Sequence, residues 1–72
     1  MQLSDVPFNK ISVGLAVVSA IGTLGRVFQL FPEGAFARYA AIVIHWDNGR
    51  VSYVWHFQSN YVQVLNWPGS SN

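Results

Sequence analysis

Two histidines and a serine are the residues of this chain whose types could perform chemistry together. His45 and His56 are its only two histidines, and Ser52 lies between them. Serine beside histidine offers a nucleophile and a base, but no carboxylate is placed to orient the imidazole. A zinc site would need a third ligand of matching type, and the chain has no cysteine. We therefore interpret the histidines as half-exposed side chains, and predict no catalytic residue, no metal site and no cofactor.

Neither a phosphate-binding loop nor a basic cluster is evident. Residues 22–25 read Gly-Thr-Leu-Gly, but the Lys and Ser or Thr that complete a nucleotide-binding loop do not follow. A nucleic-acid footprint needs clustered basic residues. The basic residues are instead scattered singly, at Lys10, Arg26, Arg38 and Arg50. The sequence therefore favours a protein that is not an enzyme, with nucleic-acid binding as the alternative to protein binding.

The element that must position these side chains is a hairpin over residues 40–57. Two apolar runs rich in β-branched and aromatic residues flank Asp47, Asn48 and Gly49. Asn-Gly between such runs is the strongest short-range hairpin signal, because both residues tolerate the positive φ of a type I′ turn. The sequence therefore predicts a long antiparallel hairpin that turns at Asn48 and Gly49. Asp47, just before the turn, is expected to accept a hydrogen bond from it.

Two registers of this hairpin are possible, and they differ in which side chains face outward. With a two-residue loop, which we favour, Tyr53 and Trp55 pair with the isoleucines of the first strand and fill the core. Both histidines and Ser52 then share the opposite face. The alternative is a type I turn with Gly49 in a G1 bulge, which slips one strand by a residue and points Tyr53, Trp55 and Phe57 outward. Three outward aromatic side chains would form a binding surface.

Length and composition indicate one small domain that self-associates. The chain has 72 residues, a formal net charge of +1, 51% hydrophobic residues and no cysteine. A chain of this size buries only about 60–65% of its unfolded surface, and no disulfide or thiolate metal site can stabilise it. A homo-oligomer would bury part of the apolar excess, and the low net charge does not oppose association. We therefore expect a homo-oligomer.

The remaining segments are expected to be short strands joined by turns. Residues 11–25 carry no charge, but this run is too short and too interrupted by glycine for a membrane span. A signal peptide with a small-residue site at 18–20 is the alternative, and Asp5 before the run argues against it. We therefore expect a cytoplasmic protein without a membrane segment. We expect three segments: a loosely held arm (1–9), one domain (10–66) and a tail (67–72). Within the domain, the expected strands are 11–19, 26–31, the two strands of the hairpin and 61–66. The expected loops are 20–25 and 32–39, and a tight turn is expected at 58–60.

A pattern of turns and strands runs through residues 14–64 and the positions next to them. It comprises glycines at turns, β-branched residues in strands, the Trp-Asp-Asn-Gly segment of the hairpin and a final Val-Gln-Val-Leu. The residues concerned are Val13, Gly14, Val17, Gly22, Gly25, Val27, Ile42, Ile44, 46–49 and 62–65. This pattern resembles the Tudor, KOW and mind-bomb branch of small barrels. The resemblance implies an all-β fold, a five-stranded SH3-like barrel with a long Asn-Gly hairpin.

The same resemblance implies a recognition module without enzymatic activity. Tudor relatives often hold a methylated Lys or Arg in an aromatic cage, through cation–π attraction. The candidate binding residues here are Tyr39, Trp46, Tyr53, Trp55 and Tyr61, with Asp47 as the carboxylate. The other interpretation is that these aromatic residues fill the core. The sequence thus predicts a non-enzymatic module that binds a protein partner or itself, the alternative being a KOW- or Tudor-like nucleic-acid-associated domain.

Overall fold

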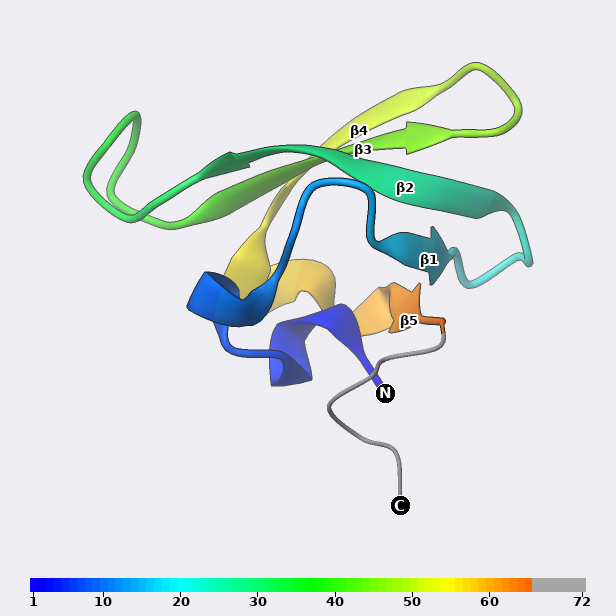
Figure 1. Ribbon diagram of the computed structural model, residues 1–72, viewed down its shortest axis with the longest axis horizontal. Coiled ribbons are helices and arrows are strands. Elements are labelled where there is room, and N and C mark those ends of the chain that lie inside the picture. The colour runs from blue at the N-terminus through cyan, green and yellow to red at the C-terminus, as the bar shows by residue number, and fades with distance from the viewer. Residues whose placement is uncertain (66–72) are drawn as a thin grey trace.

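The computed structural model describes residues 1–65, so the predicted tail at 67–72 lies outside the described residues. Within them, five strands form one antiparallel sheet in the order β4-β3-β2-β1-β5 (Figure 1). The strands are β1 (Ala16–Val18), β2 (Leu24–Phe31), β3 (Ala41–Trp46), β4 (Val51–Trp55) and β5 (Gln63–Val64), and the 3-10 turns are η1 (Leu3–Asp5), η2 (Phe8–Lys10) and η3 (His56–Tyr61). The prediction of an all-β fold is confirmed.

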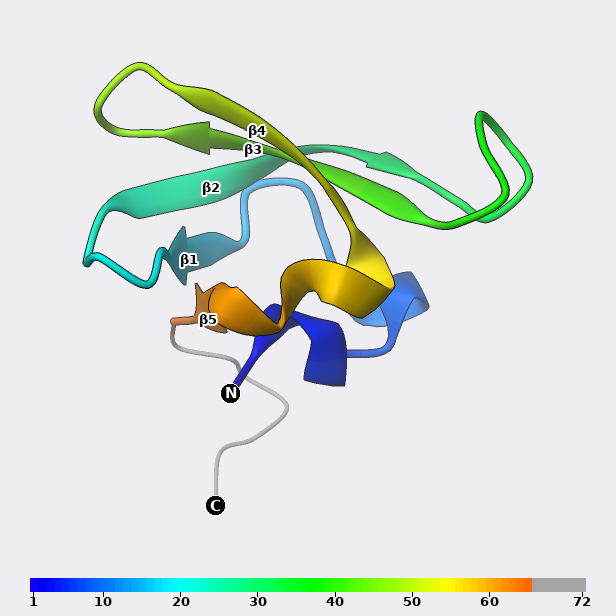
Figure 2. The ribbon, with the colours of Figure 1, turned by 180° about the vertical axis from the view of Figure 1, so that it is seen from behind.

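The sheet is open rather than closed. β4 and β5 are its two edges, and no ladder joins them within residues 1–65. The expected barrel is therefore not confirmed. Seen from the front and from behind, η1, η2 and η3 all lie on one side of the long strands β2 and β3 (Figures 1 and 2). This side is the inner face of the sheet, and the opposite side is its outer face.

The hairpin turns through a type I turn with a G1 bulge, so the favoured two-residue loop is wrong. Gly49 has φ +88°, and its N–H donates to the Trp46 carbonyl at 2.9 Å. The Trp46 N–H in turn donates to the Arg50 carbonyl at 2.8 Å. The turn bond expected from Asp47 is made by its neighbour: Asn48 Oδ1 accepts from the Arg50 N–H at 2.9 Å. This geometry matches the alternative register.

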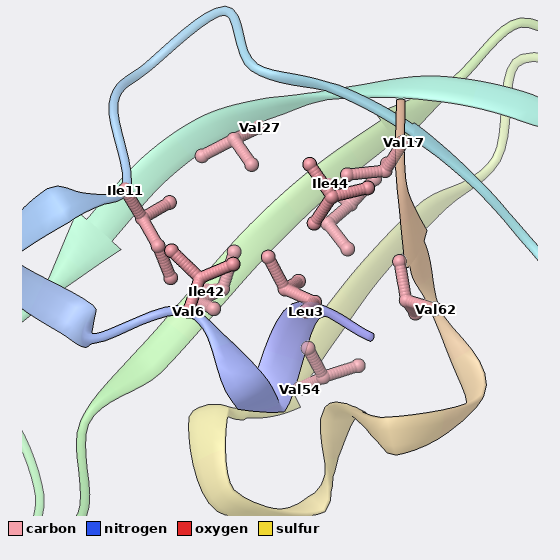
Figure 3. Close-up of a cluster of buried hydrophobic side chains, with 10 residues drawn as sticks. Leu3, Val6, Ile11, Val17, Val27, Ile42, Ile44, Val54 and Val62 are labelled. Atoms are coloured by element: carbon pink, nitrogen blue, oxygen red, sulfur yellow. The ribbon is translucent and has the colours of Figure 1, made fainter. Parts of the chain in front are cut away.

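The resulting shift of one residue inverts the whole of β4. Val54 pairs with Ile42 and lies in the core, where its side chain is 9% exposed. The expected core residues Tyr53 and Trp55 point to the outer face instead. The physical reason is the limited core volume, because Leu3 and its apolar neighbours already occupy the space beneath β3 and β4 (Figure 3). A valine fits beside them, whereas two large rings would overfill a close-packed interior.

A second bulge, in β2, exposes Phe31. The register between β2 and β3 shifts between Val27 and Gln29, which leaves Phe28 as the extra residue. One inserted residue reverses which side chains face the core beyond the bulge. Leu30 therefore packs against the core, and Phe31 lies on the outer face. The two bulges together decide the composition of that face.

The N-terminal segment closes the inner face of the sheet. The core combines it with residues from every strand: Leu3, Val6, Ile11, Val17, Val27, Ile42, Ile44, Val54, Val62 and Val64 (Figure 3). Leu3 and Val6 are 0% and 1% exposed. The Leu3 N–H also donates to the Val62 carbonyl at 2.8 Å. The expectation that residues 1–9 form a loosely held arm is therefore wrong.

The first and last strands are shorter than the sequence indicated. The strand expected at 11–19 is reduced to the three residues of β1, because a turn at Gly14 (φ +96°) precedes it. Of the strand expected at 61–66, the described part (61–65) contains only the two residues of β5, because η3 continues through Tyr61. The loop at 32–39 is confirmed. The tight turn expected at 58–60 forms part of η3.

Candidate functional site

Aromatic side chains gather on the outer face of the sheet and along its margin. They come from β2, from the loop between β2 and β3, from β4 and from η3. We call the following six residues the aromatic surface: Phe31, Phe36, Tyr39, Tyr53, Trp55 and Phe57.

Ring contacts link all six members of the aromatic surface in one chain. The centroid distances are 5.3 Å for Phe36–Phe31, 6.1 Å for Phe31–Tyr53, 5.7 Å for Tyr53–Trp55, 5.7 Å for Trp55–Tyr39 and 4.8 Å for Tyr39–Phe57. All five pairs are tilted or edge-on, the arrangements that ring quadrupoles favour. The rings nevertheless face water, since Phe36, Tyr53 and Phe57 are 69%, 45% and 55% exposed. The aromatic surface is thus ordered by its own contacts while remaining available to a partner.

A small residue beneath the rings lets them lie close to the sheet. Ala41 pairs with Phe31 on one side and with Trp55 on the other. Ala41 is 0% exposed although it faces outward, because these two larger side chains flank and cover it. Phe31 and Trp55 are accordingly half-buried, while the rings further out are exposed. The central rings of the aromatic surface therefore pack directly against β3.

The six residues of the aromatic surface are uncharged, and the exposed Arg38 lies in the loop between two of them, Phe36 and Tyr39. Glu33 and His56 line a small cleft of about 270 Å³ beside Tyr39 and Phe57. Arg26 lies further along β2, and its guanidinium donates to the Gly14 carbonyl at 3.0 Å. An uncharged, ring-lined surface of this kind favours apolar and aromatic groups of a partner.

Two of the predicted binding residues lie on the inner side, away from the aromatic surface. Trp46 lies two residues after the inward-facing Ile44 and therefore on the same face of β3, and its Nε1–H donates to Ser52 Oγ at 2.7 Å. Trp46 and Tyr61 both line a cleft of about 470 Å³ between the β1–β2 loop and the hairpin turn. Arg50 is the charged residue in this lining. We call this second feature the hairpin cleft.

The predicted binding residues therefore do not form one cage. The structure brings Tyr39, Tyr53 and Trp55 together in the aromatic surface. Trp46 and Tyr61 belong to the hairpin cleft instead. Asp47 is exposed in the hairpin turn and joins neither group of lining residues.

The residues considered for catalysis are not assembled into a site. His45 points outward and stacks on Phe28, with ring centroids 3.8 Å apart and planes 11° apart. Ser52 points inward, so the expected pairing of Ser52 with His45 on one face is wrong. His56 begins η3, and its Nε2 lies 2.7 Å from the Val6 carbonyl, which ties the N-terminal segment to η3. Among residues 1–65, no cluster of three or more His, Asp or Glu side chains could hold a metal ion.

Sequence reasoning missed two members of the aromatic surface. The sequence places Phe31 in a strand but does not say which face of the sheet it occupies, although one pattern in the strand bears on this. In the regular alternation of β2, the polar Gln29 would share the inward parity of Val27, and this conflict points to a bulge. Phe36 lies in a loop, and no local pattern foretells its contacts with Phe31 and Tyr53.

Comparison of the chain with protein-family models, with curated proteins and with solved structures finds no match. Among the helical segments of residues 1–65, none is long and apolar enough to cross a membrane.

Proposed function

We propose that this protein is a non-enzymatic interaction module that binds protein, a second copy or another chain, through the aromatic surface. One observation carries the proposal, namely the unbroken chain of six aromatic rings on a solvent-exposed face. The largest exposed apolar patch of a protein is often a functional site. Tyr and Trp are also the side chains that most often anchor protein interfaces.

The size of the aromatic surface suits one side of a protein interface. An aromatic side chain presents about 150–250 Å². With Phe36, Tyr53 and Phe57 between 45% and 69% exposed, the six rings together offer roughly 500 Å². A standard interface buries about 800 Å² on each partner, so the rings would form most of its core and their surroundings its rim.

Charge favours protein over nucleic acid as the partner. Aromatic rings on a sheet can stack on the bases of a single strand, but such sites combine the rings with a basic groove. One basic residue, Arg38, lies in the same loop as Phe36 and Tyr39. Arg26 is engaged with Gly14, and Arg50 lines the hairpin cleft. KOW- or Tudor-like binding to nucleic acid is therefore the alternative, and the experiment must distinguish it from protein binding.

The fold component of the proposal is that the open sheet is a form of SH3-like barrel. The order β4-β3-β2-β1-β5, the tight β3–β4 hairpin and the 3-10 turn η3 between β4 and β5 support it. In this interpretation the inner face holds the barrel core and the outer face is free for recognition. The interpretation supports a binding role in general and does not select a ligand.

The experiment compares the wild-type protein with a Phe36→Ser/Phe57→Ser variant. Phe28→Ser is the matched control, because Phe28 is a similarly exposed ring (53%) that contacts His45 rather than the aromatic surface. Sedimentation velocity from 1 to 200 µM measures self-association, and panning of a random peptide display library measures capture of other chains. A fluorescent oligo-dT strand tests nucleic acid.

We expect the double variant to lose self-association or peptide capture, while its melting temperature and that of the control stay within a few degrees of wild type. Salt-sensitive oligo-dT binding that the double variant loses would favour the nucleic-acid alternative and overturn the proposal. A double variant that melts well below wild type, with association and capture unchanged, would show that the rings serve the fold alone.

A further inference from the structure

β4 is an edge strand whose second side is unpaired within residues 1–65. It pairs with β3 alone, at one end of the sheet order. In both views β4 is the outermost strand near the hairpin turn, and it crosses β3 and β2 in projection before the chain turns into η3 (Figures 1 and 2). An edge strand of this kind presents a row of free N–H and C=O groups to another chain.

The hydrogen bonds at the ends of the β3–β4 ladder show which groups are free. The Trp46 N–H donates to the Arg50 carbonyl, and the His56 N–H donates to the Ala40 carbonyl. Antiparallel pairs alternate between hydrogen-bonded and non-hydrogen-bonded. Counting inward from both ends, the bonded residues of β4 are those with even numbers. The N–H and C=O groups of Val51 and Tyr53 and the N–H of Trp55 therefore point away from β3, toward the free edge, whereas the Trp55 carbonyl accepts the first hydrogen bond of η3.

The usual protections of an edge strand are missing from β4. Natural edges carry charged residues, Pro or bulges that block pairing. β4 reads Val-Ser-Tyr-Val-Trp, with no charge and no Pro, and its one bulge lies before it at Gly49. Val51 and Tyr53 are 59% and 45% exposed along this edge. The strand is thus open to addition of another strand.

We propose that β4 pairs antiparallel with β4 of a second copy, about a two-fold axis at Tyr53. This inference rests on the self-association branch of the proposed function and specifies its geometry. Tyr53 lies opposite Tyr53 of the second copy, Val51 opposite Trp55, and Ser52 opposite Val54. The contact forms about four backbone hydrogen bonds, two between the Tyr53 residues and one from each Trp55 N–H to the Val51 carbonyl of the other copy. The two sheets then become one, and their aromatic surfaces meet on the same face.

Three features select a second copy as the occupant rather than an unrelated peptide. The central pairing places Tyr against Tyr and Val against Trp on the outer face, which are favourable cross-strand combinations. With no charged residue in β4, the two-fold axis brings no like charges together. The net charge of +1 adds little repulsion between copies. A two-fold contact is also closed, so it leads to a dimer and not to a fibre.

The test is Tyr53→Pro against Tyr53→Ala. Proline removes the Tyr53 N–H, which points to the free edge and makes no bond to β3, so an edge strand tolerates it. Alanine removes the same ring but keeps the N–H. We expect Tyr53→Pro to raise the dimer dissociation constant by about 100-fold relative to Tyr53→Ala, tenfold for each of the two central hydrogen bonds. Equal dissociation constants for the two variants would overturn edge pairing while leaving association through ring contacts intact.

Amide hydrogen exchange of the wild-type protein provides a second measurement that does not depend on the folding of a variant. In the proposed dimer the amides of Tyr53 and Trp55 are protected at high protein concentration and lose protection on dilution. Those of Ser52 and Val54, which face β3, stay protected throughout. An exchange pattern at Tyr53 and Trp55 that does not change with concentration would overturn the proposal, as would a wild-type protein of 8.0 kDa at every concentration.

Discussion

Replacing Gly49 tests the register that places the aromatic rings outside. Gly49 has φ +88°, and a Cβ built on it meets no atom within 4 Å. No clash therefore contributes, and the whole effect of a substitution comes from the backbone. A non-glycine residue in the left-handed region costs about 1–2 kcal/mol, and a β-branched residue more. Alanine recovers about 0.4–1 kcal/mol by restricting the unfolded chain.

These terms set an order among variants. We expect the free energy of unfolding to fall by less than about 1 kcal/mol for Gly49→Asn, by about 1 kcal/mol for Gly49→Ala and by about 2 kcal/mol or more for Gly49→Val. A domain of 72 residues has a total stability of only about 4–11 kcal/mol. Each kcal/mol lowers its melting temperature by about 4–8 °C. Thermal unfolding followed by circular dichroism resolves such differences.

Asn48→Ala is the control that separates the two registers. In the observed type I turn Asn48 has a negative φ, so alanine loses only the exposed hydrogen bond that Asn48 Oδ1 accepts from the Arg50 N–H. We expect the free energy of unfolding to fall by no more than about 0.5 kcal/mol, because this bond is exposed. In the two-residue loop both central residues have positive φ, and Asn48→Ala would then be as costly as Gly49→Ala. That equality, or an unchanged melting temperature for Gly49→Val, would refute the G1-bulge assignment.

Two further substitutions test the packing on the inner face. Gly25→Ala should cost about 1–3 kcal/mol, because the new Cβ would lie 2.5 Å from a Trp46 ring carbon and 2.9 Å from the His45 carbonyl; an unchanged urea midpoint would contradict this close approach. Leu3→Ala should cost about 2–5 kcal/mol because Leu3 is 0% exposed. Met1→Ala, at a residue that is 50% exposed, should cost less than about 0.5 kcal/mol, and similar midpoints for the two variants would show that the N-terminal segment does not stabilise the core.

Much of the fold could be predicted from local signals. Apolar runs interrupted by Asn, Gly and Pro predict the hairpin, the strand at 26–31, the loop at 32–39 and the tight turn at 58–60. The burial of Ile42 and Ile44 was also predicted. The N-terminal segment was misjudged, because Leu3 and Val6 are single apolar residues in a polar, turn-forming stretch. Their burial depends on a backbone bond from Leu3 to Val62, at the opposite end of the chain.

The candidate site could be predicted only as a set of residue types. The sequence indicated that aromatic residues would matter and named Tyr39, Tyr53 and Trp55, which the structure brings together. It also named Trp46 and Tyr61, which the structure places at the hairpin cleft. Aromatic residues have the same local propensity on either face of a strand. The face must therefore come from the pairing register, which local residues do not determine.

The sequence by itself determined that the chain is all-β, that it turns at Asn48 and Gly49, and that it carries few charged residues. Only the tertiary structure decided which side of β4 faces the core. Asn-Gly is compatible with both turn types, which differ by one residue of register. The choice between them depends on volume, because Leu3 and its neighbours from the N-terminal segment, together with Val62, leave room under β4 for Val54 and not for Tyr53 and Trp55. The rings are exposed because the core was filled by residues distant in sequence.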